Sequence, residues 1–252
     1  MKMLAAHGLA IGYRHHPVGE DIELSLVAGE VLCLLGPNGG GKTTLFRTLL
    51  GILPPLAGRV EVAGRELADW SRAALATQIA YVPQSQAGLF AFTVEEVVLM
   101  GRTARLGRFA TPSARDREKA RACLARLGIG HLGERIYTEI SGGERQLALI
   151  ARALAQEAAI LILDEPTASL DFGNQLRVLK EIDALKAQGL AILMSTHQPE
   201  HALRVADRIA LLKAGRIVAQ GPRTLVTAQT LAALYGVDAG EVARSLPQLA
   251  HL

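Results

Sequence analysis

The fold is decided by the stretch Val31-Leu32-Cys33-Leu34-Leu35-Gly36-Pro37-Asn38-Gly39-Gly40-Gly41-Lys42-Thr43-Thr44. It begins as an apolar strand and continues into the pattern G-x-x-x-x-G-K-[ST], after which a helix is expected to start at Gly41 and Lys42. Glycines let the backbone curve so that its N–H groups point at phosphate oxygens, and the helix N-terminus adds a partial positive charge. Lys42 is placed to reach the β- and γ-phosphates, and Thr43 a Mg²⁺ ion. A glycine-rich turn with a solvated lysine is the alternative, but it does not explain the position between strand and helix.

The composition limits the classes of protein to which this chain can belong. The chain has 252 residues, of which 50% are hydrophobic, so it can form one large domain or two coupled ones, and disorder is excluded as its main state. Cys33 and Cys123 lie ninety residues apart, which disfavours a disulfide framework and fits a reducing compartment. A net charge of +3 with 4% aromatic residues offers few platforms for stacking bases, so nucleic acid is not an expected partner. No signal peptide or membrane-spanning run is present, which predicts a soluble, cytoplasmic chain that meets a membrane only through a partner.

The periodicity of the remaining elements predicts an α/β domain with an α-helical insertion. Strands are expected at Met3–Leu9, Ile22–Leu26, Val31–Leu35, Val60–Val62, Ile160–Leu163 and Ala191–Thr196, with a hairpin of Ile209–Leu212 and Ile217–Ala219. Helices are expected to begin at two capping boxes, Thr93 to Glu96 and Ser141 to Glu144, and near Ser113, with others at 175–186 and 200–206. We expect residues 1–86 and 156–222 to form the α/β catalytic core, 87–155 a helical subdomain, and 223–252 a C-terminal helical extension.

Two acids follow the apolar strand Ile160–Leu163. Asp164 and Glu165 stand before Pro166, which cannot continue a strand. Carboxylates at the carboxyl end of a buried strand are typical of ligand sites. We expect Asp164 to hold Mg²⁺ through its water shell and Glu165 to orient and polarise an attacking water. An acidic loop after a core strand is the simpler alternative.

A second anion-binding surface is predicted at residues 141–146. Ser141 is the expected N-cap of a helix whose first two positions are Gly142 and Gly143, where glycine costs stability relative to alanine. Bare glycines leave N-terminal N–H groups open to an anion, and the Ser141 hydroxyl can contact a phosphate oxygen. Judged from helix capping alone, an anion-binding site and an ordinary capped helix are equally supported.

Taken in order along the chain, these motifs resemble the ATP-binding cassette (ABC) ATPases over nearly the whole sequence. The resemblance implies a P-loop NTPase core with an antiparallel β subdomain and an inserted α-helical subdomain. It also implies ATP hydrolysis with Mg²⁺. The sequence Ser141-Gly142-Gly143-Glu144-Arg145-Gln146 looks like the signature motif. The resemblance implies that this motif closes over the γ-phosphate held by the other protomer in a head-to-tail homodimer.

The resemblance also implies roles for single residues. Tyr13 looks like the adenine-stacking aromatic, and Gln84 like the Q-loop glutamine, a metal ligand and catalytic group. Asp171 looks like the D-loop aspartate, and His197 like the switch histidine that touches the γ-phosphate. Without this context Tyr13 is a packing residue, and His197 is a loop histidine or, with His201, a metal ligand.

Three segments resemble one branch of the family, the ATPases of metal-chelate importers: 98–102, 170–175 and 196–199. That branch serves siderophores, haem, cobalamin and, in some members, molybdate or tungstate. The implied partners are a polytopic membrane permease dimer and a separate substrate-binding protein, with the ATPase bound peripherally at the cytoplasmic face of the inner membrane. The alternatives are a soluble ABC ATPase of iron–sulfur cluster assembly, a P-loop small-molecule kinase and a substrate-binding module.

Two surface segments have open interpretations. A basic run, interpreted as a solvated helical face or as a surface near anionic lipid headgroups, consists of Arg102, Arg105, Arg108, Arg115, Arg117, Lys119 and Arg121. The apolar segment 88–92 follows Gln84 closely, and we expect it to form a groove for a permease helix, with core packing as the alternative.

Overall fold

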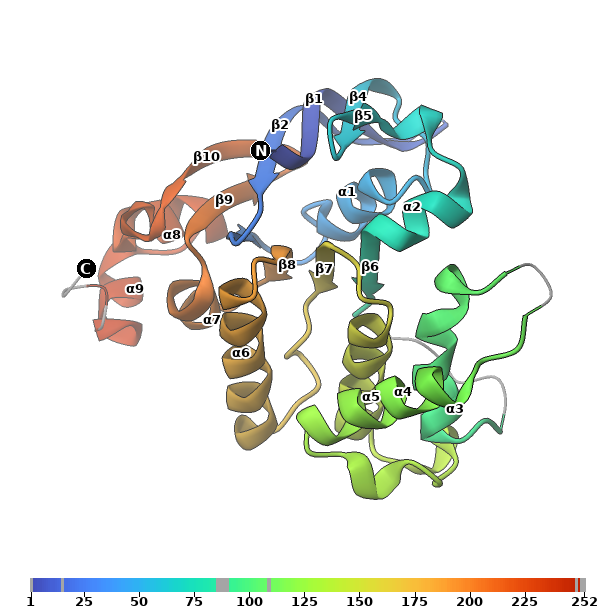
Figure 1. Cartoon of the computed structure of the whole chain (residues 1–252). Coiled ribbons are helices and arrows are strands. Elements are labelled where there is room, and N and C mark those ends of the chain that lie inside the picture. The colour runs from blue at the N-terminus through green and yellow to red at the C-terminus, as the bar shows by residue number, and fades with distance from the viewer. Residues whose placement is uncertain (1, 15, 85–90, 108–109, 248, 250–252) are drawn as a thin grey trace. The chain divides into compact units, whose positions relative to one another are not determined.

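Two compact units make up the chain: Met1–Asp69 together with Ala191–Leu252, called unit 1, and Trp70–Leu190, called unit 2. The computed structural model describes residues 2–14, 16–84, 91–107, 110–247 and 249 (Figure 1). Each unit is described by itself below. The subdomain boundaries expected from the sequence, with a helical part at 87–155, stay a prediction.

Figure 1 labels the helices and all of the strands below except β3. The strands are β1 (Lys2–Tyr13), β2 (His16–Val27), β3 (Val31–Leu35), β4 (Ala57–Val62), β5 (Arg65–Glu66), β6 (Ile79–Val82), β7 (Ile160–Asp164), β8 (Ala191–Thr196), β9 (Arg208–Lys213) and β10 (Arg216–Pro222). The α-helices are α1 (Lys42–Leu49), α2 (Arg72–Gln78), α3 (Val94–Leu99), α4 (Ala114–Arg126), α5 (Gly142–Ala155), α6 (Phe172–Ala187), α7 (Pro199–Val205), α8 (Ala228–Tyr235) and α9 (Ala239–Ser245). A 3₁₀ segment, η2 (Met100–Arg105), follows α3 directly.

Unit 1 contains two groups of strands. An antiparallel sheet has the order β2-β1-β4-β5. The second group has the order β10-β9-β3-β8, in which β3 pairs in parallel with both β8 and β9. All five residues of β3 are buried, as an unbroken apolar run predicts for a strand covered on both faces. The antiparallel sheet that the resemblance implies is therefore present, and the second group of strands contains parallel pairs.

Helix α1 fixes the loop before it to this core. Leu45, Phe46 and Leu49 are completely buried, and each such side chain contributes about 1.5–3 kcal/mol through removal from water. Thr48 is buried as well, and Arg47 is the one exposed residue of the helix. These buried side chains fix the position of the helix on the core, and with it the position of the loop that precedes the helix.

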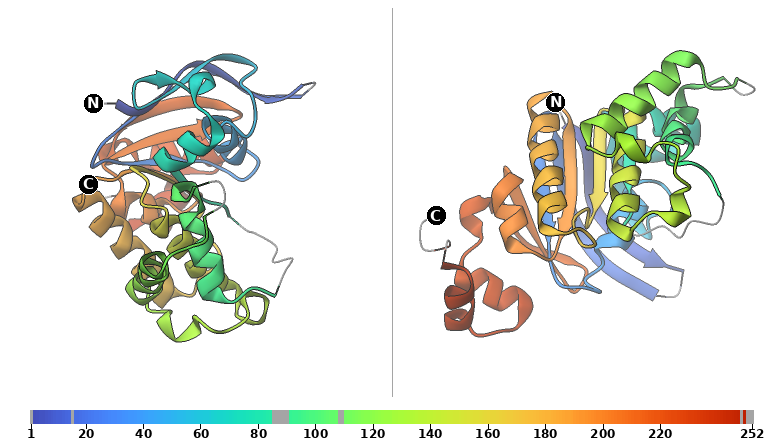
Figure 2. Two further views of the ribbon diagram at one scale, coloured as in Figure 1. Left: turned by 45° about the vertical axis from the view of Figure 1, so that its right-hand side comes forward. Right: turned by 90° about the horizontal axis from the view of Figure 1, so that it is seen from below.

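Unit 2 joins a pair of parallel strands, β6 and β7, to a cluster of helices. Helices α3, α4 and α5 pack on one another and appear in green to yellow in Figure 2. Their N-caps carry capping boxes at Thr93, Ser113 and Ser141, in which each side chain accepts from the third helical residue. The boxes predicted at Thr93 and Ser141 are confirmed, and a third is present at Ser113.

Two further features of the described residues are the length of the helices and a cavity in unit 2. None of the described helices is long and apolar enough to cross a membrane. Within unit 2, a cavity of about 370 Å³ lies among α4, α5, β7 and the end of α6, with the Cys123 thiol in its wall. Both cysteines are free thiols, and burial raises the pKa of each, to about 11 for Cys123.

Candidate nucleotide-binding site

The loop Gly36–Gly41 leaves the buried strand β3 and turns directly into α1. Gly41 is the N-cap of α1 and has a φ of 99°, a conformation that favours glycine. A Cβ on Gly36 would lie 2.2 Å from the carbonyl oxygen of Leu212, so the backbone there is too close to β9 for any side chain. The first turn of α1 contains no acidic residue, which leaves its N-terminus attractive to an anion.

Lys42 folds back over this loop. Its Nζ donates to the carbonyl oxygens of Gly36 at 2.8 Å and Pro37 at 3.0 Å, and the side chain is buried. The contacts hold the ammonium group above the curve of the loop, at the position from which it would face the phosphates of a nucleotide. Thr43 and Thr44 follow in the first turn, both half-buried.

Tyr13 lies beside the same helix. It ends β1 with its ring 45% exposed, and its hydroxyl accepts a hydrogen bond from Nη1 of Arg47 on α1 at 3.2 Å. A half-exposed aromatic ring tied to the helix that follows the phosphate loop suits a base-stacking role better than a packing role. The role itself stays a prediction.

His197 leaves the same edge of the sheet as the phosphate loop. Leu35 and Thr196 are register partners in the parallel strands β3 and β8, so the residues that follow them, Gly36 and His197, emerge side by side. The carbonyl oxygen of His197 accepts from the Tyr235 hydroxyl at 3.0 Å, which anchors its backbone to α8. Burial lowers the pKa of the neighbouring His201. The described residues contain no group of three or more His, Cys, Asp or Glu side chains suited to a metal ion.

The predicted carboxylates come together with Gln84 in unit 2. Val82 of β6 is the register partner of Leu163 of β7, so the segments after these strands share one edge. There the Gln84 Nε2 donates to Glu165 Oε2 at 3.2 Å, and the Tyr81 hydroxyl lies 3.5 Å from Asp164 Oδ2. The sequence analysis assigned no role to the Tyr81 hydroxyl.

Glu165 has a strained backbone. Its φ is 48°, in the left-handed region that non-glycine residues seldom adopt, and its side chain is only 5% exposed. Such strain costs about 1–3 kcal/mol and persists where the surroundings hold it, most often at functional sites. The conformation is consistent with a carboxylate kept in place for chemistry.

The helix with bare glycines at its start, α5, is called the signature helix below. Ser141 is its N-cap: the Ser141 hydroxyl oxygen accepts from Glu144 N, and Glu144 Oε2 accepts from Ser141 N at 2.7 Å. The backbone N–H of Ser141 thereby lowers the pKa of Glu144. Ser141 and Gly142 are exposed, whereas Gly143 is half-buried.

Asp171 belongs to a loop that touches this helix. A Cβ on Gly143 would lie 3.5 Å from Ser169 O, so the loop runs alongside the first turn of α5. Asp171 caps α6 by accepting from Asn174 N at 2.9 Å, and this bond lowers its pKa. Gln175 Nε2 donates to Leu170 O at 3.1 Å and Thr167 O at 3.3 Å, and these bonds support the loop. No sequence motif marks this half-buried glutamine.

The predicted Mg²⁺ ligands fit a hard cation by their chemistry. Thr43 offers a hydroxyl, Gln84 an amide oxygen and Asp164 a carboxylate, all of them oxygen donors of the kind Mg²⁺ prefers. Asp164 is 1% exposed, and a buried carboxylate is stabilised by a positive charge close to it. These residues are therefore suited to the ion.

Of the two predictions about surfaces, that of the basic run is wrong at one residue, and that of the permease groove stays a prediction. Arg102 is buried, with 6% exposed, so the interpretation of the whole basic run as a solvated face is wrong for this residue. Arg115 and Arg117 are exposed, as that interpretation expects. Arg108 and residues 88–90 of the predicted permease groove lie outside the described residues; within the same segment Phe92 is 40% exposed.

The model of the ABC transporter family matches residues 20–168, which include the phosphate loop, the signature motif and both carboxylates. The chain belongs to the ABC transporter family. An uncharacterised ABC transporter ATP-binding protein of Haemophilus influenzae is 44% identical over 99% of this chain and 92% of its own length. The hemin import ATP-binding protein HmuV of Gloeobacter violaceus is 40% identical over 94% of this chain and 88% of its own.

A similar solved structure supports the same family. An ABC transporter assigned to the metal-chelate type, in an inward-facing conformation, superposes with a TM-score of 0.82 at 36% identity, covering 94% of this chain and 90% of the other. The ABC ATPase fold predicted from the sequence is therefore confirmed, as are ATP binding and the ATPase class of the chain.

Proposed function

We propose that this chain is the ATP-hydrolysing subunit of an importer for a metal chelate or a metal oxyanion, working as a homodimer beneath a membrane permease. A separate binding protein delivers the substrate, and the ATPase sits peripherally on the cytoplasmic face of the inner membrane. One observation carries the ATP-driven part: the chain presents two phosphate-binding surfaces, the loop at Gly36–Gly41 and the exposed start of the signature helix. The hemin importer and metal-chelate transporter among its relatives support the substrate class.

The phosphate loop binds the nucleotide within one chain. Its N–H groups and the N-terminus of α1 attract the phosphates, Lys42 neutralises charge on the β- and γ-phosphates, and Tyr13 stacks on the base. His197 contacts the terminal phosphate from the neighbouring strand. Oxygens of Thr43, Gln84 and Asp164 would hold a Mg²⁺ ion, which would supply Lewis-acid stabilisation of the phosphate oxygens.

Hydrolysis needs an oriented water and a partner. Glu165 accepts a hydrogen bond from the attacking water, and the amide of Gln84, 3.2 Å from it, keeps the carboxylate in that orientation. Ser141 and the glycines of the second chain close over the γ-phosphate, with Asp171 at the same face. Loss of that phosphate removes the differential affinity for the closed dimer, which then reopens.

Reconstitution tests the proposal. The chain is coexpressed with the permease encoded beside it and placed in proteoliposomes with the binding protein, and uptake of hemin, cobalamin and molybdate is measured with ATP on the ATPase side. We expect ATP-dependent uptake of one of them, and none with K42A. Recovery of the chain with soluble proteins alone, and never with a permease from detergent-solubilised membranes, would instead favour the iron–sulfur assembly alternative.

A further inference from the structure

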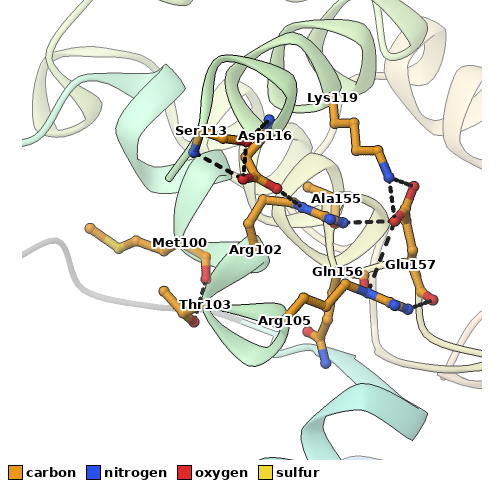
Figure 3. A network of polar contacts seen from close by, with 10 residues as sticks. All are labelled: Met100, Arg102, Thr103, Arg105, Ser113, Asp116, Lys119, Ala155, Gln156 and Glu157. Atoms are coloured by element: carbon orange, nitrogen blue, oxygen red, sulfur yellow. Dashed lines mark hydrogen bonds and ion pairs between the residues drawn. The ribbon is translucent and has the colours of Figure 1, made fainter. Parts of the chain in front are cut away.

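Two arginines of η2 hold the carboxyl end of the signature helix (Figure 3). The Arg102 Nη1 donates to Ala155 O at 2.7 Å, while Arg105 donates to Gln156 O at 2.8 Å and to Glu157 O at 2.5 Å. Carbonyls at the end of a helix lack partners within it, and cations there also complement the negative end of its dipole. We call Arg102 and Arg105 the arginine clamp.

Carboxylates from two other segments fix the buried half of the clamp. Arg102 Nε donates to Asp116 Oδ1 of α4 at 2.9 Å, and its Nη1 also contacts Glu157 Oε2 at 2.8 Å. Lys119 donates to both oxygens of Glu157, at 2.6 and 2.7 Å. Glu157 has a φ of 53°, which lets its carboxylate fold back onto these cations just after the helix ends. Arg102 thus has a single possible orientation.

The backbone of η2 lies directly on the same end of α5. A Cβ on Gly101 would be 2.1 Å from the carbonyl oxygen of Arg152, so no larger residue fits between the two elements. From the other side, Gln156 Nε2 donates to Ile79 O at 2.8 Å, at the start of the strand that runs to Gln84. The last turn of α5 is therefore held between η2 and β6.

The two ends of the signature helix differ sharply. Its carboxyl end is held by the buried Arg102 and the part-exposed Arg105, whereas Ser141 and Gly142 at its start are exposed. Fourteen residues make a rod about 20 Å long, so a tilt of about 5° at the held end moves Ser141 by about 2 Å. Misplacement of a reacting group by about 1 Å can cost on the order of 10²-fold in rate.

We propose that the arginine clamp positions the signature helix, so that its loss impairs ATP-driven closure of the dimer without changing nucleotide binding by the phosphate loop of the same chain. Arg102 and Arg105 are positioning residues: they contact the far end of α5 and act on the partner's nucleotide through Ser141. This inference rests on the proposed two-chain site.

The test uses the E165Q chain, in which ATP-driven dimers accumulate, and measures the dimer dissociation constant in ATP by sedimentation. We expect E165Q/R105A and E165Q/R102K to raise this constant at least tenfold, with R105K in between. Affinity of the monomer for a fluorescent ATP analogue should stay within twofold. In the wild-type background, kcat per nucleotide-binding site, counted by titration with the ATP analogue, should fall while KM for ATP stays within twofold. Counting sites removes the effect of any unfolded fraction, so a lower kcat per site cannot come from loss of stability alone.

The control is E165Q/R121A, which removes an arginine of α4 that is 69% exposed and pairs with Glu95 rather than α5. It should dimerise like E165Q. Arg105 is 37% exposed, so R105A is expected to fold even if R102K does not. Dimerisation of the clamp variants equal to that of E165Q would overturn the clamp, whereas an E165Q chain that stays monomeric in ATP would overturn the proposed function itself.

Discussion

Glu165 joins three properties that seldom occur together: burial, a left-handed backbone and a hydrogen bond from Gln84. Glutamine has the same shape and fits the same conformation, so E165Q should remove the proton acceptor and leave the fold. We expect ATP binding to be retained, phosphate release to fall on the order of 10²–10⁴-fold, and a closed dimer to accumulate in ATP. Phosphate release and light scattering after gel filtration measure both effects.

The matched control is E118Q, a change of the same kind at an exposed position on α4. It should hydrolyse ATP at the wild-type rate. Hydrolysis at that rate by E165Q would remove Glu165 from the role of base, and the strained backbone would then need another explanation.

The start of the signature helix makes a prediction about a whole element. S141R fills the exposed start of the helix with a cation and removes a cap worth about 1 kcal/mol. We expect hydrolysis to be lost while the monomer binds nucleotide with unchanged affinity, because the phosphate loop is a separate element. S71R, at the N-cap of α2, removes a cap of the same kind and should keep its activity. Normal hydrolysis by S141R would contradict a site made of two chains.

The ion pairs around α4 predict how stability depends on pH. Hydrogen bonds from the Ser113 hydroxyl and from Arg102 lower the pKa of Asp116 from 3.8 to about 2. A carboxylate with a lowered pKa stabilises the fold above its unfolded pKa, and this contribution is lost as the pH falls from about 4 toward 2. The urea midpoints of wild type and D116N should therefore differ most above pH 4 and converge below it. A difference that stays constant down to pH 2.5 would contradict this account.

Much of the arrangement of elements is predictable from the sequence because the apolar runs and capping boxes are local signals. Strand β3, helix α1 and the start of α5 lie where the pattern predicts them. Helix α2 was missed because it spans seven residues and buries none of them, so no apolar stripe marks it. The role of Arg102 was misjudged because its carboxylate partners stand 14 and 55 positions away, and a charge run does not reveal such pairing.

The site residues also divide into those that a sequence motif marks and those that it does not. Phosphate-loop glycines, Lys42 and the acids after β7 are marked by motif and by position at strand ends, which the topology preserves. The contact of Tyr81 with Asp164, 83 positions apart, arises from tertiary packing. Gln175 reaches back only five residues to Leu170, through a side-chain hydrogen bond that no motif marks. Side-chain hydrogen bonds, between distant segments or within one loop, are thus the part that the sequence does not reveal.

At the scale of the whole molecule, one exposed side chain is a candidate contact with the second chain of the proposed homodimer. Phe172 opens α6 directly after Asp171 and is 75% exposed. Burial of such a ring contributes about 1.5–3 kcal/mol, so F172S in the E165Q chain should weaken the ATP-driven dimer on the order of tenfold or more. V218S, at an exposed valine of β10, should leave the dimer unchanged. An unaltered dimer dissociation constant for F172S would show that Phe172 lies outside the contact between the two chains.

The raised pKa values of Cys33 and Cys123 have a practical consequence. At pH 7 a thiol with a pKa near 11 is ionised in about one molecule in ten thousand, and the thiolate is the form that maleimides attack. Dyes or spin labels can therefore be attached to one cysteine introduced on an exposed helix without first replacing the native pair. Opening and closing of the ATPase could then be followed by spectroscopy in an otherwise natural chain.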